Sequence, residues 1–261
     1  MFFQNQIDRF LLKGRGGHAY PLGYTPAKDR SHEKTYALAA LPEAEWPVGV
    51  PITIGINWYG SFDTPELYNG RYWIARNGKV GTLRGGHCIC VKSTHQTDPL
   101  SSWSFYDQGK EGACVGFGTS RMMSLLNRKK YDAHWLWDIA KAGDEFPDTN
   151  PGDDNGTSVH AGIDVLLKKG HVPWQTSYAG RTWQQRDTEA PSLTEGVSAI
   201  RWATSVDEMR KVLDTPLHDQ LQAFPLLNSW GRYYAHLVWL PYTVMERLIK
   251  EDGEIALVTD R

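Results

Sequence analysis

The stretch that decides the fold is residues 108–117, Gln-Gly-Lys-Glu-Gly-Ala-Cys-Val-Gly-Phe. It places Gln108 six residues before Cys114, with two glycines between them and an apolar run after the thiol. This order predicts a helix that begins at Cys114, where unpaired backbone N–H groups and the helix dipole lower the pKa of a thiol. It also lets the Gln108 amide turn back as a donor beside the sulfur, the position from which an oxyanion is stabilised. The stretch therefore predicts a cysteine nucleophile.

Two further motifs supply partners for such a thiol. Residues 85–91, Gly-Gly-His-Cys-Ile-Cys-Val, put His87 at the start of an apolar strand. Residues 228–231, Asn-Ser-Trp-Gly, follow the apolar strand 224–227. A nucleophilic thiol needs an imidazole base, and the imidazole needs a group that fixes its orientation and tautomer. Together with residues 108–117, these motifs resemble the three signature blocks of the papain-like cysteine peptidases.

The resemblance implies an α+β, two-lobed papain-like fold, in which a helical lobe with the cysteine is inserted into an antiparallel, β-barrel-like lobe with the histidine and asparagine. It implies catalytic roles for Cys114 as nucleophile, His87 as base, Asn228 as the group that orients His87, and Gln108 in the oxyanion hole. Three further residues are expected at the substrate cleft, namely Trp230, Gly86 and Gly112.

The order of the motifs departs from the family. The family has Cys first, then His and Asn, whereas here His87 precedes Cys114 and Asn228 lies far downstream of both. The simplest account is a circularly permuted-like order, which leaves catalysis intact because catalysis depends on spatial arrangement. We expect an N-terminal arm (1–46), a β lobe (47–98 plus 197–261) and a helical lobe (99–196), which form one two-lobed catalytic domain. No N-terminal segment resembles the inhibitory propeptide of secreted papain relatives, so regulation is open.

Composition narrows the function classes. The chain has 261 residues, 41% of them hydrophobic, and a formal net charge of −2. Its basic residues are scattered, which excludes an electrostatic footprint for nucleic acid. No apolar run approaches the roughly 20 residues that span a bilayer, and the first residues do not form a secretory signal. Three cysteines do not form a disulfide framework. We therefore expect a cytoplasmic protein or part of a larger assembly, with a protein or peptide substrate and neither a cofactor nor a membrane or nucleic-acid partner; the oligomeric state is left open.

Local patterns predict the main elements. Alternation from Pro51 and at residues 71–75 and 88–91 indicates strands, and Asn77-Gly78 is typical of a hairpin turn before Lys79. Helices are expected over residues 114–127, 158–170, 205–213 and 241–250, the third opened by a capping box of Ser205 and Glu208. A strand is expected over residues 254–258. Gly116 and Gly118 weaken the first helix by about 1 kcal/mol each relative to Ala, which suggests close packing of another backbone.

Two metal sites are alternative interpretations. His87, Cys88, Cys90 and His95 invite zinc, but strand alternation puts Cys88 and Cys90 on the face opposite His87. The acidic loop 144–155 invites calcium, but it lacks the closing Glu of an EF-hand, and a solvated loop fits it better. His236 is the second choice for the base.

The sequence therefore predicts a cysteine peptidase that hydrolyses peptide or isopeptide bonds through a thioester intermediate. One alternative is a catalytically silent papain-like module with a structural or interaction role, motivated by the permuted order and by altered cleft residues. The other is a Cys-His acyl transferase, which passes the acyl group to an amine instead of water.

Overall fold

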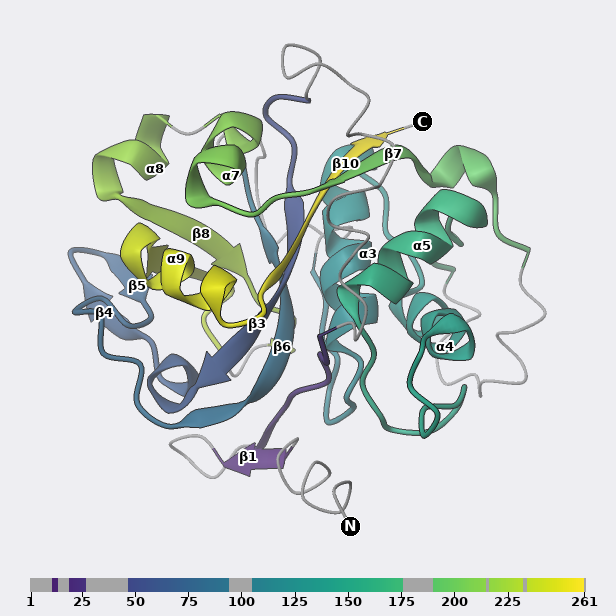
Figure 1. The fold of residues 1–261 in the computed structure, drawn as a ribbon, viewed down its shortest axis with the longest axis horizontal. Coiled ribbons are helices and arrows are strands. Elements are labelled where there is room, and N and C mark those ends of the chain that lie inside the picture. Colours follow the sequence, from purple (N-terminus) through teal and green to yellow (C-terminus); the bar gives the residue numbers. More distant parts are fainter. Residues whose placement is uncertain are drawn as a thin grey trace.

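A computed structural model describes residues 11–13, 19–26, 47–93, 105–175, 190–214, 216–231 and 234–260. An eight-stranded sheet lies on one side of the molecule, and helices α3 (Cys114–Asn127), α4 (Ala133–Gly143) and α5 (Val159–Lys168) pack together on the other (Figure 1). The strands follow the order β4-β5-β9-β8-β6-β3-β10-β7. Their bounds are β3 Ile52–Tyr59, β4 Glu66–Tyr68, β5 Arg71–Trp73, β6 Leu83–Val91, β7 Val197–Trp202, β8 Ala223–Leu227, β9 Leu237–Pro241 and β10 Glu254–Asp260.

The sheet confirms the α+β class but not its finer description. The order of the described strands leaves β4 and β7 at open edges, so the barrel-like closure is not confirmed. The sheet is also not wholly antiparallel, because β5 pairs with β9 in parallel at Trp73 and Trp239.

The sheet separates two apolar cores. Alternation along β6 sends Ile89 and Val91 into one core and Cys88 and Cys90 into the other. The first core lies beneath α7 (Val206–Leu213) and α9 (Tyr242–Lys250), with α8 (Pro216–Leu221) beside them. The second core is shared with α3, α4 and α5.

The helix α3 begins at Cys114, as the sequence predicts. Its glycines are required by close neighbours on both sides. A Cβ at Gly116 would lie 2.3 Å from the Ala133 carbonyl oxygen of α4, and one at Gly118 would lie 3.0 Å from the Cys88 sulfur of β6. The two glycines therefore let α3 pack tightly between α4 and the sheet, which confirms the expected close approach.

The helix α4 was not predicted, although its signals are in the sequence. The side chain of Asp132 caps it, because Oδ1 accepts from the backbone N–H groups of His134 and Trp135, each at 3.1 Å. The buried residues Trp135, Leu136, Ile139 and Ala140 recur at helical spacing.

Serine side chains cap the starts of two predicted helices. Ser158 caps α5 by accepting from Ala161 N at 3.1 Å, and Ser205 caps α7 by accepting from Glu208 N at 3.2 Å. The carboxylate of Glu208 reaches Thr204 N at 2.7 Å instead of Ser205 N, so the expected capping box forms in one direction only.

The predicted hairpin at Asn77-Gly78 is wrong. The turn exists, with Gly78 N donating to Ala75 O at 2.8 Å, but it does not join paired strands. The strand β9 occupies the edge of β5. In addition, Ile74 N donates to Trp239 O of β9 at 3.0 Å. The next strand, β6, therefore begins later and pairs with β3 and β8.

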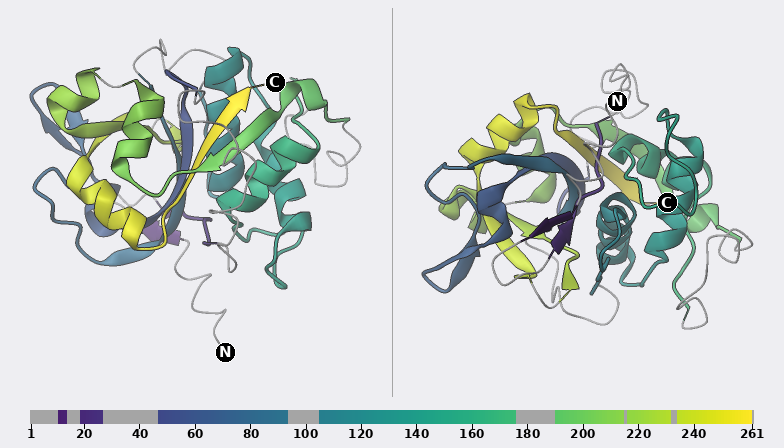
Figure 2. Two further views of the ribbon diagram at one scale, coloured as in Figure 1. Left: turned by 45° about the horizontal axis from the view of Figure 1, so that its top comes forward. Right: turned by 90° about the horizontal axis from the view of Figure 1, so that it is seen from below.

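Part of the N-terminal arm runs between the sheet and the helices. The strands β1 (Leu11–Lys13) and β2 (Ala19–Pro21) pair with each other, and the chain then enters the boundary between the two sides (Figures 1 and 2). There Tyr24 N donates to Gly86 O of β6 at 3.2 Å, and Thr25 N donates to Thr157 O at 3.1 Å. The rest of the arm, the crossing 94–104 and residues 176–189 lie outside the described residues.

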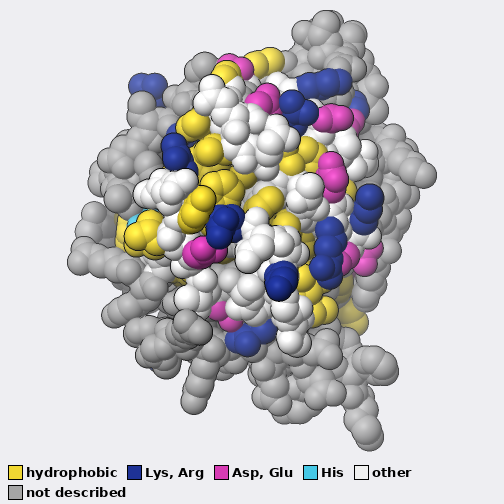
Figure 3. Space-filling model, turned by 90° about the vertical axis from the view of Figure 1, so that its left-hand side faces the viewer, with side chains coloured by type: hydrophobic (Ala, Val, Ile, Leu, Met, Phe, Trp, Pro, Cys, Tyr) yellow, Lys and Arg dark blue, Asp and Glu magenta, His cyan; other side chains and the backbone are white. Residues whose placement is uncertain are grey.

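The surface charges and the helix lengths concern two classes of partner, nucleic acids and membranes. On the face shown in Figure 3, Lys and Arg side chains are interspersed with Asp and Glu and do not gather into one patch. Within the described part of the chain, no helix is long and apolar enough to cross a membrane.

Candidate active site

The sulfur of Cys114 lies at the start of α3 against the strand that carries His87. Cys88 N–H, in the residue after His87, donates to Cys114 Sγ at 3.3 Å. The backbone N–H groups of Gly23, Val115 and Cys114 itself also lower the thiol pKa, but complete burial outweighs them and raises this pKa to about 12. The expected thiolate is therefore absent at neutral pH in this arrangement, because the helix terminus is present but water is excluded.

The side chains of His87 and Asn228 meet, although 141 residues separate them in the sequence. His87 Nε2 lies 2.9 Å from Asn228 Oδ1, and the same oxygen accepts from Ser229 N at 2.8 Å. A backbone N–H can only donate, so Oδ1 is the acceptor and neutral His87 must carry its proton on Nε2. Nδ1 then holds a lone pair, and among the described residues it has no hydrogen-bond partner. This is the tautomer that can take a proton through Nδ1.

Two indoles enclose the imidazole. The ring of Trp230 lies 4.6 Å from that of His87 at an interplanar angle of 31°, and Trp58 meets His87 edge-on at 4.8 Å. Burial lowers the pKa of His87 to about 4, partly opposed by the hydrogen bond with Asn228. Trp230, expected at the cleft, thus lies against the imidazole that contacts Asn228.

Arg121 connects the cysteine helix to the asparagine. It lies two turns after Cys114 on α3, is fully buried, and donates from Nη1 to Asn228 O at 2.7 Å. Burial lowers its pKa to about 10. Sequence reasoning missed this residue; its signal is a single arginine within an apolar helix, which is rarely buried without partners.

Gln108 is buried beside the turn that leads to Cys114. Its backbone N–H donates to Ser229 O at 2.9 Å, and its side-chain Nε2 donates to Glu111 O at 3.0 Å. A side-chain amide carries two N–H bonds. One of them is used within the turn, and among the described residues the other makes no hydrogen bond.

Residues 22–25, the covering segment, lie over the sulfur. The Gly23 backbone lowers the pKa of the Cys114 thiol, and Thr157 N donates to Gly23 O at 2.9 Å. A Cβ at Gly23 would lie 1.6 Å from Gly112 O, so only glycine fits there. Two of the expected cleft residues, Gly86 and Gly112, thus lie against this segment. The sequence offered no signal for it beyond a glycine between two large apolar residues.

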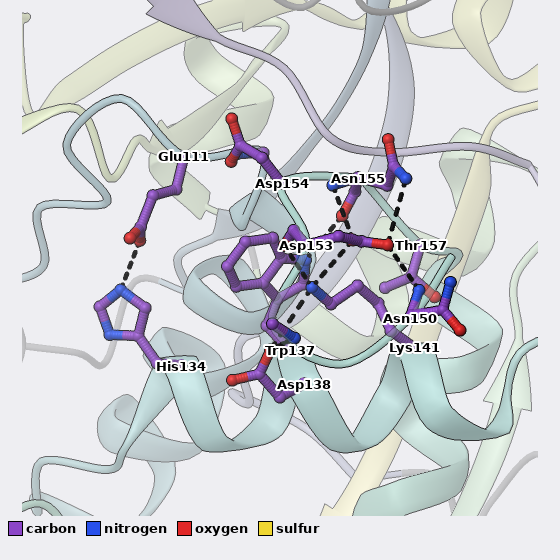
Figure 4. Close-up of polar contacts among 12 residues, drawn as sticks. Glu111, His134, Trp137, Asp138, Lys141, Asn150, Asp153, Asp154, Asn155 and Thr157 are labelled. Atoms are coloured by element: carbon purple, nitrogen blue, oxygen red, sulfur yellow. Dashed lines mark hydrogen bonds and ion pairs between the residues drawn. The ribbon is translucent and has the colours of Figure 1, made fainter. Parts of the chain in front are cut away.

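The acidic loop that follows α4 is organised by a lysine. Lys141, whose side chain is fully buried, donates to Asp153 O at 2.6 Å and lies 3.2 Å from Asp153 Oδ1 and 3.4 Å from Asp138 Oδ1 (Figure 4). Its ammonium also lies 3.7 Å from the centre of the Trp137 ring. This ammonium takes the place that the calcium alternative would give to a metal ion. Thr157, two residues after this loop, binds the covering segment.

Two alternatives from the sequence concern zinc and the second candidate base, His236. Over the described ranges, no three or more His, Cys, Asp and Glu side chains are grouped so as to hold a metal ion, and His95 lies outside these ranges. The ring of His236 packs against Phe105 at 4.9 Å, and its backbone carbonyl accepts from Asn228 N at 3.3 Å.

Comparisons with known proteins give one structural likeness. No protein-family model matches the sequence, and no curated protein matches it. Among solved structures, the chain is similar to that of xylellain, a cysteine protease from Xylella fastidiosa, with 12% sequence identity and a TM-score of 0.49. The match covers 92% of this chain and 96% of that one. A likeness of this size identifies neither a family nor an activity.

Proposed function

We propose that this chain is a cysteine peptidase of the papain-like kind, in a circularly permuted-like order, and that it is held in a latent form. The observation that carries the proposal is the contact between His87 and Asn228, which fixes the imidazole tautomer one residue away from the N–H group bound to the Cys114 sulfur. A nucleophile, a base and a group that orients the base are the minimum for thiol catalysis.

In the proposed reaction, Cys114 Sγ attacks the carbonyl carbon of a peptide or isopeptide bond, and its proton passes to His87 Nδ1. The Cys114 N–H and the second N–H of Gln108 Nε2 bind the oxyanion. The C–N bond then breaks, and the leaving amine takes the proton from His87. Water, deprotonated by His87, hydrolyses the resulting thioester, and the cysteine leaves as a thiol after its proton returns.

The latent form follows from the protonation states of the Cys114 thiol and the His87 imidazole. With the thiol pKa at about 12 and the imidazole pKa at about 4, both groups are neutral at pH 7 beneath the covering segment. Once that segment leaves, water reduces the desolvation that disfavours the charged forms. A thiolate–imidazolium pair can then form, and its titration belongs to both residues jointly.

The test is to map which cysteine reacts in a full-length chain whose covering segment is displaced, the Gly23→Leu variant. We expect iodoacetamide to modify Cys114 before the equally buried Cys88 and Cys90, as located by mass spectrometry. Preferential modification of Cys88 or Cys90 would contradict the proposal. Alkylation of Cys114 no faster than that of a free thiol, without peptide cleavage, would favour the silent module. Acyl products with an added amine, in place of hydrolysis, would favour the transferase.

We expect Gln108→Ala, introduced into the Gly23→Leu chain, to lower kcat by roughly 10²-fold, the usual cost of losing one oxyanion donor. Alkylation of Cys114 should persist, because thiolate formation does not require that donor. Steady-state kinetics on a cleavable peptide gives kcat and KM separately. A rise in KM with kcat unchanged would show that Gln108 contributes to substrate binding alone.

A further inference from the structure

The side chain of Tyr24 fills a pocket beside the candidate nucleophile. Tyr24 follows Gly23, whose backbone lies against Gly112 and lowers the pKa of the Cys114 thiol, and Tyr24 is almost completely buried. Its ring packs in the same core as Cys88 and Cys114. The pocket therefore lies one residue along an extended chain from the point that touches the sulfur.

Two glycines of the sheet make room for this ring. A Cβ at Gly55 of β3 would lie 2.3 Å from Tyr24 Cε2, and a Cβ at Gly86 of β6 would lie 2.8 Å from Tyr24 Cδ1. Both distances are shorter than any real carbon contact, so a methyl group at either position would displace the ring. The sequence has thus left a flat space on this face of the sheet, one side-chain layer deep.

The far end of the pocket favours a side chain whose tip carries a hydrogen-bond donor. The Tyr24 hydroxyl donates to the backbone carbonyl of Asp252 at 3.0 Å. Two backbone hydrogen bonds hold the turn that presents this carbonyl. Glu251 N donates to Arg247 O at 3.1 Å, and Gly253 N donates to Leu248 O at 3.1 Å. A carbonyl can only accept, so the pocket favours a ring with a hydroxyl at its tip over a plain phenyl ring.

The backbone groups around the pocket suit any extended peptide. Gly86 O accepts from Tyr24 N, while Thr157 donates to Gly23 O and accepts from Thr25 N. These three bonds are made by main-chain atoms on both sides and do not depend on the side chains of the bound strand. Selectivity must then come from the pocket that Tyr24 occupies.

We propose that this pocket, lined by Gly55 and Gly86 and closed by the Asp252 carbonyl, is the specificity pocket of the peptidase and takes a tyrosine side chain of the substrate. This inference rests on the proposed function. The covering segment occupies the pocket with the chain's own Tyr24, and a substrate presents its tyrosine one residue from the residue that touches the sulfur.

The test uses the full-length Gly23→Leu chain and a peptide library whose cleavage products are sequenced by mass spectrometry. We expect tyrosine to be enriched at one position next to the residue attacked. Matched peptides should show kcat/KM for tyrosine about fivefold above phenylalanine, the size of one hydrogen bond. They should also show tyrosine at least tenfold above alanine, from burial of the ring.

The Gly55→Ala change, added to the same chain, provides the control. Its methyl group fills the space of the ring, so the ratio of kcat/KM for tyrosine over alanine should fall toward one; alkylation of Cys114 reports that this variant is folded. Cleavage without aromatic enrichment in the Gly23→Leu chain, or an unaltered ratio in the folded Gly55→Ala variant, would overturn this inference alone. No cleavage together with slow alkylation of Cys114 would overturn the proposed function and this inference with it.

Discussion

Gly23→Leu is expected to raise the rate at which iodoacetamide alkylates Cys114 by about 10- to 150-fold. Any side chain at position 23 collides with the Gly112 carbonyl at 1.6 Å, and a backbone cannot yield as a flexible side chain can. The covering segment must therefore leave, and Tyr24 leaves its pocket with it. Burial of one large apolar side chain is worth about 1.5–3 kcal/mol. If burial of Tyr24 is what keeps the site closed, the loss of this free energy corresponds to the 10- to 150-fold rise in the alkylation rate.

The matched control is Gly143→Leu, at the end of α4, where an added Cβ meets nothing within 4 Å. Its alkylation rate should equal that of the unchanged chain.

The pH dependence of the alkylation rate supplies a second readout. Beneath the covering segment the raised thiol pKa of about 12 makes the rate climb with pH throughout the neutral range. In Gly23→Leu, a restored thiolate should flatten this climb. Equal rates for both variants would show that residues 22–25 do not restrict the sulfur.

The sequence predicted elements whose signals are local. The helix start at Cys114 and the cap by Ser205 depend on a few neighbouring residues, and both are present as expected. The predicted hairpin at Asn77-Gly78 failed because a turn signal does not specify which strand will pair with its neighbours. There, β9 from far along the chain takes the place beside β5.

The candidate site shows the same difference between local signals and contacts that the sequence does not reveal. The motifs singled out His87 and Asn228, and the structure brings their side chains to 2.9 Å. No spacing in the sequence could show that Arg121 would bind the Asn228 carbonyl, or that Lys141 would neutralise the acidic loop. Arg121 is buried against a residue 107 positions away, and Lys141 reaches Asp153 across the 12 positions of a loop whose path no local signal fixes. The covering segment was missed for a further reason: it binds mostly through backbone atoms, which every residue carries.

In the Gly23→Leu chain, Cys114→Ala and His87→Ala are each expected to lower kcat by about 10⁵- to 10⁶-fold. Neither group has a chemical role alone: the thiol is protonated without a base, and the imidazole has no proton to take without the thiol. Residues that act as one unit therefore lose nearly all of their effect with the first substitution. The double variant should be no slower than either single variant. Steady-state kinetics on one tyrosine peptide measures all three.

Stability must be separated from chemistry in this comparison, because both side chains are buried. Cys114→Ala removes only a sulfur atom, whereas His87→Ala removes the imidazole partner of Asn228 Oδ1 and leaves a space between Trp58 and Trp230. Thermal unfolding should therefore show the larger loss for His87→Ala, while the losses in kcat stay equal. Losses in kcat that instead add up in the double variant would mean that the two residues act independently. In that case the fixed tautomer of His87 would serve packing, and the base would have to be sought elsewhere, with His236 the first to examine.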